Sequence, residues 1–224
     1  MAEVGKGTPE ARLRHALSVA SSSARLQIAL AAGTQPDESY IEVLVEYCGV
    51  EPDFFVRDML TWALTRHDPE LTVESVLPQL HSASARARSQ ALHTLSKIGN
   101  PTTWTAITVD LLHDEDVEVA RTAWRTAVGL VPAGHETELA EELVSELGRG
   151  DRETQRSLSC AFAALGTAAK PVIGDAAISE NQAVSAHAVA TLAIMADPDE
   201  GFDAAIAEAK RAVALRGAPM SKEQ

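Results

Sequence analysis

The feature that most constrains the fold is a segment that recurs along the chain at nearly equal intervals. In its clearest copy, residues 53–69, apolar side chains fall at three- and four-residue steps, which is the spacing of one helical face. Aligning the copies gives six equivalent anchor positions, spaced 34, 31, 33, 34 and 30 residues apart: Ser23, Arg57, Arg88, Arg121, Gln155 and Ser185. Because a near-constant period of this length is typical of repeat architectures, the sequence predicts an array of structural repeats.

Each anchored helix is followed or preceded by a candidate partner helix. Partner helices are predicted at 37–49, 71–81, 102–113, 136–149 and 168–178, and a last helix at about 199–215 is expected to cap the open end. Thr8 and Pro9 combine an N-cap with proline at the first helical position, so a helix is expected to begin there. Two antiparallel helices cannot cover their own apolar faces, so each pair is expected to stack on the next, with Leu64, Leu95 and Leu192 buried between paired helices.

Composition agrees with a helical core. Aromatic residues make up 4% of the chain, while Ala and Leu are abundant, which favours small-residue helix packing over a sheet core. Residues 40–47 are rich in β-branched side chains and could form a strand, but their helical neighbours and the Pro36-Asp37 start favour a helix. The predicted fold class is all-α, with residues 1–7 as a flexible lead, 8–216 as a single domain and 217–224 as a polar tail.

The repeated pattern, Val/Ala-Arg-x-x-Ala/Leu-x-x-Ala/Thr-Leu followed by Gly, Asp, Asn or Pro, is carried best by residues 56–69, 87–101 and 184–198. It resembles the second helix of HEAT repeats, as found in small bacterial HEAT-repeat proteins. The resemblance implies a right-handed α-solenoid of about six helix pairs. HEAT-like folds include scaffolds, bilin lyases and alkylpurine DNA glycosylases, so the resemblance specifies architecture far better than function.

In HEAT arrays the anchor arginine often pairs with an aspartate of a neighbouring turn. Asp53 with Arg57 and Asp116 with Arg121 match that arrangement, and Arg88 is a further anchor. The resemblance therefore implies a structural role for these residues. Ser23, Gln155 and Ser185 depart from the pattern, so the implied ladder is partial.

Charge narrows the classes of partner. The formal net charge is -13, with an isoelectric point near 4.9, which disfavours both general nucleic-acid binding and an anionic membrane surface. No apolar run approaches the roughly 18 residues that a membrane-spanning helix needs. Cys48 and Cys160 are too few and too far apart for a disulfide framework or a cysteine-rich zinc site, so reduced thiols in a cytoplasmic protein are expected.

A search for catalytic and metal-binding motifs predicts no catalytic residue, no cofactor and no metal site. His113 and the three acidic residues after it could hold a divalent cation, but adjacent residues at a helix end point in different directions. The alternative is an acidic loop that caps the helix beginning at Asp116. His67 and Asp68 are either an acid–base pair in a cleft or a polar helix end before Pro69.

One group of residues is a candidate binding site. Trp62 and His93 occupy equivalent positions in adjacent repeats, and the second helices line the concave face of HEAT-like solenoids. The candidate residues on that face are Asp58, Trp62, Arg66, Ser89, His93, Lys97 and Arg125. An aromatic side chain with polar neighbours suits recognition. The alternative is that Trp62 packs over the seam between repeats.

A local excess of positive charge suggests the kind of partner. Residues 75–109 contain no Asp or Glu, although Arg86, Arg88 and Lys97 lie there. An acidic or phosphorylated protein segment could be attracted to this region, or the charges could be ordinary solvated surface. The expected function is therefore a non-enzymatic scaffold that binds a protein or peptide. The alternative is a HEAT-like DNA glycosylase or another nucleic-acid-binding solenoid, for which Trp62, Asp58 and Arg88 supply the residue types.

Overall fold

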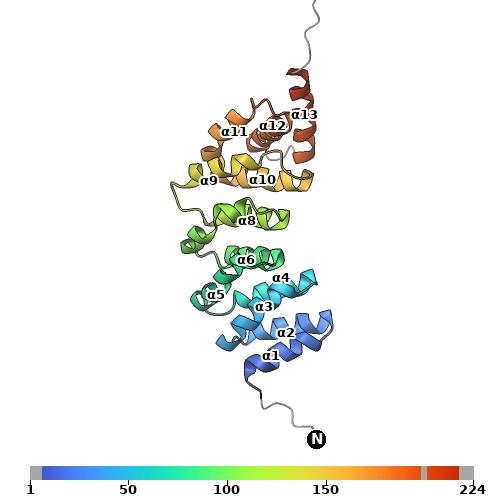
Figure 1. Ribbon diagram of the computed structural model, residues 1–224, viewed down its shortest axis with the longest axis vertical. Helices are drawn as coiled ribbons and strands as arrows, with labels where there is room; N and C mark the ends of the chain where they lie inside the picture. The colour runs from blue at the N-terminus through green and yellow to red at the C-terminus, as the bar shows by residue number, and fades with distance from the viewer. Residues whose placement is uncertain (1–6, 198–200, 217–224) are drawn as a thin grey trace, which may run out of the picture.

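The computed structural model describes residues 7–197 and 201–216, and all of its regular elements in those ranges are helices. The all-α prediction is confirmed, including the helix predicted over residues 40–47. Figure 1 shows the helices stacked one after another along the long axis of an elongated molecule. The predicted tail and, apart from Gly7, the predicted N-terminal lead lie outside the described residues.

The described helices form six successive pairs followed by one more helix. The second helices of the pairs are α2 (Ser22–Thr34), α4 (Phe54–Leu64), α6 (Ala85–Ile98), α8 (Val117–Leu130), α10 (Arg152–Leu165) and α12 (Gln182–Ala196). The first helices are α1 (Pro9–Val19), η1 (Glu38–Tyr40) with α3 (Ile41–Val50), α5 (Pro69–Val76) with η2 (Leu77–His81), η3 (Pro101–Ala106) with α7 (Val109–Leu112), α9 (Glu136–Leu143) with η4 (Val144–Glu146), and η5 (Gly166–Ala169) with α11 (Lys170–Ala176). The last helix is α13 (Phe202–Arg216).

The contacts between helices follow this order. Each first helix packs on its own second helix, and each second helix packs on the next one, from α2 through α4, α6, α8 and α10 to α12. Helix α13 packs on α12, at the end of the stack opposite α1 (Figure 1). The second helices therefore form one continuous layer, and any groove along that layer is lined by neighbouring pairs.

Helix starts are set by short polar side chains and by proline. Thr8 accepts a hydrogen bond from Ala11 N–H and Pro9 is the first residue of α1, as predicted. The segment 53–69, predicted as one helix, is shorter: α4 ends at Leu64. Asp68 then caps α5 and Pro69 occupies its first turn, so the Asp-Pro pair begins the next helix as well as preventing the first from continuing.

The core confirms most of the apolar register. Leu64 and Leu95 were expected between paired helices and are 1% and 0% exposed. Leu192 was expected there too but is only half-buried, because α12 also buries Ala186 and Ala190 against α13. The register inferred from the sequence is therefore correct in the middle of the array.

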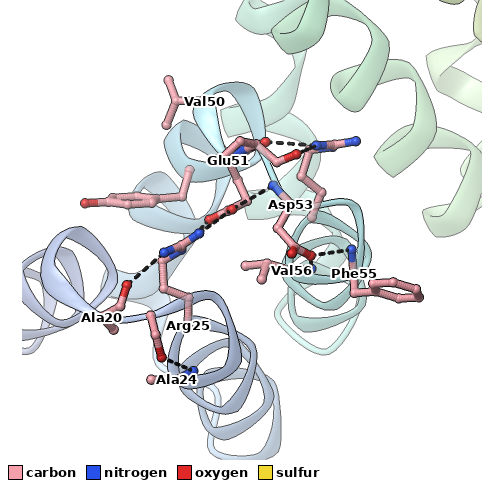
Figure 2. Close-up of polar contacts among 12 residues, drawn as sticks. Ala20, Ala24, Arg25, Val50, Glu51, Asp53, Phe55 and Val56 are labelled. Atoms are coloured by element: carbon pink, nitrogen blue, oxygen red, sulfur yellow. Dashed lines mark hydrogen bonds and ion pairs between the residues drawn. The ribbon is translucent and has the colours of Figure 1, made fainter.

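An arginine–carboxylate pair ties the first two helix pairs together (Figure 2). Arg25 of α2 donates Nε–H and Nη2–H to the two carboxylate oxygens of Glu51, both at 2.7 Å, and Glu51 is 3% exposed. Burial alone would raise the pKa of Glu51, but the hydrogen bonds from Arg25 and from Asp53 N–H outweigh burial, and the pKa is lowered. Arg88 and Asp114 form an equivalent bidentate pair at 2.8 and 2.9 Å between later repeats.

These pairs correct the expected partners of the anchor arginines. Arg57 donates to the carbonyl oxygens of Glu51 and Pro52, not to Asp53, because the Asp53 carboxylate accepts the N–H groups of Phe55 and Val56 as an N-cap.

The second expected partner is corrected in the same way. Arg121 pairs with Glu118 and Glu153, at 2.8 and 2.9 Å, while Asp116 caps α8 by accepting the N–H groups of Glu118 and Val119. In both repeats the aspartate is used at the helix start, so it does not face the anchor.

The first anchor was also misplaced. Arg25 donates to the carbonyl oxygen five residues earlier, Ala20, as Arg57 does to Pro52 and Arg88 to Ala83. Arg25, not Ser23, is therefore the equivalent residue, and the first interval is 32 residues (57 minus 25).

One stretch, Arg152–Ala176, is long and apolar enough by composition to cross a membrane, with an 18-residue window of mean hydropathy 1.2. In the fold it is interrupted at Gly166, where α10 ends with φ of 65°. Leu158 and Phe162 of this stretch are fully buried in the core. By composition, the expectation that no apolar run approaches this length was wrong. One such helix is weak evidence for a membrane span, because the core helix of a protein outside the membrane passes the same composition test.

We predict that Leu95→Ala lowers the free energy of unfolding by about 2 to 5 kcal/mol, because it leaves a cavity at a fully buried site. Urea denaturation at neutral pH measures this change. Leu30→Ala is the matched control, since Leu30 is 36% exposed and should cost clearly less. Equal losses in the two variants would show that the register is wrong.

A second prediction concerns the buried ion pair. Glu51→Ala leaves the Arg25 guanidinium without its partner and should destabilise the protein by about 3 to 5 kcal/mol. Glu153→Ala removes a carboxylate whose side chain is 73% exposed and should cost less than about 1 kcal/mol. The two urea unfolding curves compare these effects directly, and a Glu51→Ala loss as small as the control would contradict the structural role of the pair.

Candidate functional site

A groove of about 600 Å³ runs across α4, α6 and α8 in the layer of second helices. We call it the α4–α8 groove. Its lining includes four of the seven candidate residues predicted from the sequence: Asp58, Ser89, His93 and Arg125. Three successive second helices contribute to it, because α4 packs on α6 and α6 on α8. This packing order brings the four residues together.

The other three candidate residues do not line the α4–α8 groove. The Trp62 ring packs over Gly33 of α2, so closely that a Cβ atom on Gly33 would lie 2.5 Å from it. Trp62 is 38% exposed and lies at the seam between α2 and α4. Arg66 follows the end of α4 and Lys97 lies in the last turn of α6, both exposed to solvent.

Inside the groove the polar side chains are loosely connected. The nearest His93 and Asp58 atoms, Nε2 and Oδ1, are 3.9 Å apart, and Ser89 Oγ lies 3.1 Å from Thr122 Oγ1. Burial lowers the pKa of His93, and nearby Lys97 lowers it further, so the imidazole is neutral at neutral pH. The groove therefore presents hydroxyl groups and a neutral imidazole between charged side chains.

The charged side chains that line the groove differ in whether they already have a partner within the protein. Its lining carries the carboxylates of Asp58, Asp116 and Glu118 and the guanidinium groups of Arg57, Arg86 and Arg125. Asp116 caps α8 and Glu118 pairs with Arg121.

The arginines, by contrast, have no carboxylate partner among the described residues. Arg86 donates to the carbonyl oxygens of Val50 and Glu51 at 3.3 Å, and Arg125 donates at 3.3 Å to Arg121 O and Thr122 Oγ1. Their positive charges are therefore free to bind an anion.

Two aromatic residues beside the groove were missed in the sequence analysis. Phe54 lines the groove and is 64% exposed, and Phe55 beside it is 69% exposed, with the two rings packed edge to face. The signal was present in the sequence. Asp53 caps α4, so the two residues after it occupy the first turn, before the buried face of the helix begins at Val56. Exposed aromatic rings of this kind are frequent at recognition sites.

The structure also brings together a serine and a histidine that lie 28 residues apart in the sequence. Ser159 Oγ lies 3.0 Å from His187 Nε2, but Ser159 is 1% exposed and His187 is fully buried. His187 Nδ1 accepts the N–H of Gly148, so Nε2 carries the proton and donates to Gln155 O. A histidine in this tautomer cannot take the serine proton, so this pair is structural and not a nucleophile with its base.

The acidic loop after α7 has a structural role. Asp116 caps α8, as one of the two expectations stated, and no group of three or more His, Cys, Asp or Glu side chains among the described residues is placed to hold a metal ion. His113 lies between Glu146 and Glu142, at 2.7 and 2.6 Å. Burial alone would lower the pKa of His113, but these two carboxylates reverse that effect and the pKa is raised.

His67 and Asp68 form a helix end. The Nδ1–H of His67 donates to Ala63 O at 2.8 Å, and Asp68 accepts the N–H groups at the start of α5. The two side chains thus have separate partners, so they do not form an acid–base pair.

We predict that His187 makes stability depend on pH. Burial lowers its pKa from 6.5 to about 4, so the unfolded chain binds the proton more readily. The stability is fully present above about pH 6.5 and falls as the pH drops toward 4, by about 3 kcal/mol in total. In His187→Gln this component should be absent, whereas His15→Gln, at an exposed site, should keep it. Urea unfolding as a function of pH measures the difference, and identical pH profiles for wild type and His187→Gln would contradict it.

Comparisons with known proteins do not identify a family. No family model matches the chain, and no curated protein matches it. Among solved structures, one engineered protein from the Northeast Structural Genomics Consortium has a TM-score of 0.47 and 20% identity, covering 94% of this chain and 98% of its own. A second engineered protein from the same consortium has a TM-score of 0.46 and 17% identity, covering 84% of this chain and 99% of its own. Likenesses at this level carry no conclusion about function.

Proposed function

We propose that this protein is a non-enzymatic interaction module that binds an acidic or phosphorylated protein segment in the α4–α8 groove. The observation that carries the proposal is the combination of Arg86 and Arg125, which lack carboxylate partners among the described residues, with the exposed ring of Phe54. Arginine binds carboxylate and phosphate oxygens through two parallel hydrogen bonds. An exposed aromatic ring provides apolar contact area at low entropic cost.

The proposal includes the architecture. We assign the six helix pairs to a right-handed α-solenoid of the HEAT-like type, which the continuous layer of second helices supports. Arg25, Arg57 and Arg88 support it as well, since each donates to the carbonyl oxygen five residues earlier. In such an array the second helices line the concave surface, so an extended segment in the α4–α8 groove would contact several repeats at once.

The groove stands out against the charge of the whole chain. The protein carries a formal net charge of -13, whereas the groove lining balances three arginines against three carboxylates. Two of those carboxylates are occupied by the cap of α8 and by Arg121. The groove lining is therefore less negative than the chain as a whole, which favours approach of an anionic segment there over other parts of the surface.

The groove lining has no excess of positive charge, which a nucleic-acid-binding groove would need. The glycosylase alternative drew on Trp62, Asp58 and Arg88, but Trp62 packs over Gly33 and Arg88 is paired with Asp114. Duplex binding also depends on neutralising many phosphates with Lys and Arg. We therefore favour a protein partner. A cytoplasmic location is part of the proposal, since Cys48 and Cys160 are both free thiols.

A defined peptide tests the proposed function. The probe is a fluorescein-labelled peptide that contains alternating Glu and phosphoserine around one Trp, and its binding is followed by fluorescence anisotropy at low salt. Arg86→Glu with Arg125→Glu should weaken binding at least about tenfold, because two attractions become repulsions. Phe54→Ala should weaken binding with little change in salt dependence, since it removes an apolar contact.

The matched control is Arg156→Glu with Lys170→Glu, which changes the net charge equally at exposed sites away from the groove. We expect the control to bind within about twofold of wild type. Equal weakening in both double variants would mean that only net charge matters, and the groove assignment would fail. A labelled DNA duplex run in parallel would overturn the protein-partner assignment if it bound more tightly than the peptide.

A further inference from the structure

A second and larger groove lies in the layer of first helices, between α3 on one side and α5 with η2 on the other. Its volume is about 880 Å³, and the N-terminal part of α6 closes one end through Ser84 and Ala87. We call it the α3–α5 groove. It shares no lining residue with the α4–α8 groove.

The charges that line the α3–α5 groove are all of one sign. Glu38, Glu42, Glu46 and Glu74 line it, and its lining contains no Lys, Arg or His. Glu46 pairs with Arg14 of α1. Glu38, Glu42 and Glu74 are exposed, and their carboxylates form neither a hydrogen bond nor an ion pair in the part of the chain that the structure describes.

The ion pair between Glu46 and Arg14 does not account for the whole row of glutamates. Glu38, Glu42 and Glu46 follow one another at four-residue steps from η1 into α3, so their side chains share one face. Like charges at this spacing repel one another. Glu38 and Glu42 of this row, and Glu74 across the groove, have no ion-pair partner among the described residues, so their placement is explained better by what the groove binds than by stability.

The groove also offers apolar surface. Val50 is 61% exposed and Leu71 is 39% exposed at its margins, while Ile41 and Val45 are buried beneath them. Gly49 lets α3 approach α6 closely, since a Cβ atom there would lie 3.1 Å from the Cβ atom of Ala87. The groove therefore has apolar side chains between the row of glutamates on η1 and α3 and the single carboxylate of Glu74 on α5.

We infer that the α3–α5 groove is a second docking surface, which takes a basic, amphipathic protein segment: an apolar side chain against Val50 and Leu71, with Lys or Arg beside the glutamates. Charge complementarity selects this occupant, because free carboxylates line the groove and cations are absent from its lining. The protein would then hold two segments of opposite charge on its two helix layers. This surface stands independently of the proposed function of the α4–α8 groove.

The test uses a synthetic, amidated helical peptide with Lys on one face and Leu on the other, labelled with fluorescein. Wild type should bind it saturably at low salt. Glu42→Lys with Glu74→Lys should weaken binding at least about tenfold. Glu141→Lys with Glu180→Lys is the matched control, since both residues are exposed, lie outside the groove and give the same change in net charge. The control should bind within about twofold of wild type.

Two further variants keep the test decisive. Glu42→Gln with Glu74→Gln removes charge without reversing it, and its affinity should fall between those of wild type and the Lys variant; it decides the question if the Lys variant does not fold. Leu71→Ser should weaken binding without changing its salt dependence. The inference is overturned if wild type does not bind the peptide, or if the control double variant weakens binding as much as the groove variant. Binding of the acidic peptide by the groove variants reports separately on the α4–α8 groove.

Discussion

The arrangement of the N-terminal half depends on one buried carboxylate, that of Glu51. A charge taken out of water is costly unless it is fully paired. Glu51 meets this requirement by accepting two hydrogen bonds from Arg25 and one from the N–H of Asp53 (Figure 2). Its own carbonyl oxygen accepts from Arg57 and Arg86. One residue thus connects α2, α4 and α6, which belong to three successive helix pairs.

The position of the α4–α8 groove follows from that connection. Arg86 is held against the loop that contains Glu51, and Asp53 in the same loop caps α4 and leaves Phe54 at its exposed first turn. Further along, Arg88 and Asp114 repeat the bidentate pair and fix α6 against the loop before α8. The groove therefore depends on the loops before α4 and α8, where Glu51 and Asp114 bind arginine side chains of other helices. The apolar core supplies most of the stability.

The sequence predicted what depends on local pattern. Helix starts at Thr8 and Asp116 and the buried positions of Leu64 and Leu95 all follow from residues close together in the chain. The predicted set also included four residues that line the α4–α8 groove, because the repeat puts equivalent positions on one side. These predictions needed only the spacing of apolar residues within each helix and the order of neighbouring helices.

What could not be predicted depends on contacts between distant residues. Arg25 meets Glu51 across 26 residues and Ser159 meets His187 across 28, and nothing in the local pattern signals either pair. The sequence left open whether Trp62 faces a groove or packs over a seam. The indole packs over Gly33 of α2, a contact between residues 29 positions apart (62 minus 33), so the seam interpretation holds. The Asp53 carboxylate was expected to pair with Arg57. It instead accepts hydrogen bonds from the free N–H groups at the start of α4, which are closer in the chain. Which of several possible partners a charged side chain binds depends on the three-dimensional positions of all of them, and the local sequence does not give these positions.

The central claim is that the helix pairs stack in sequence into an elongated array, so that each helix layer presents its own groove. Small-angle X-ray scattering of the full chain measures this most directly. A compact domain of this length has a radius of gyration of about 17 Å. The stacked array predicts a clearly larger radius and a distance distribution with an extended tail. A radius close to 17 Å with a symmetric distribution would mean that the helix pairs fold back on one another, and would contradict the account.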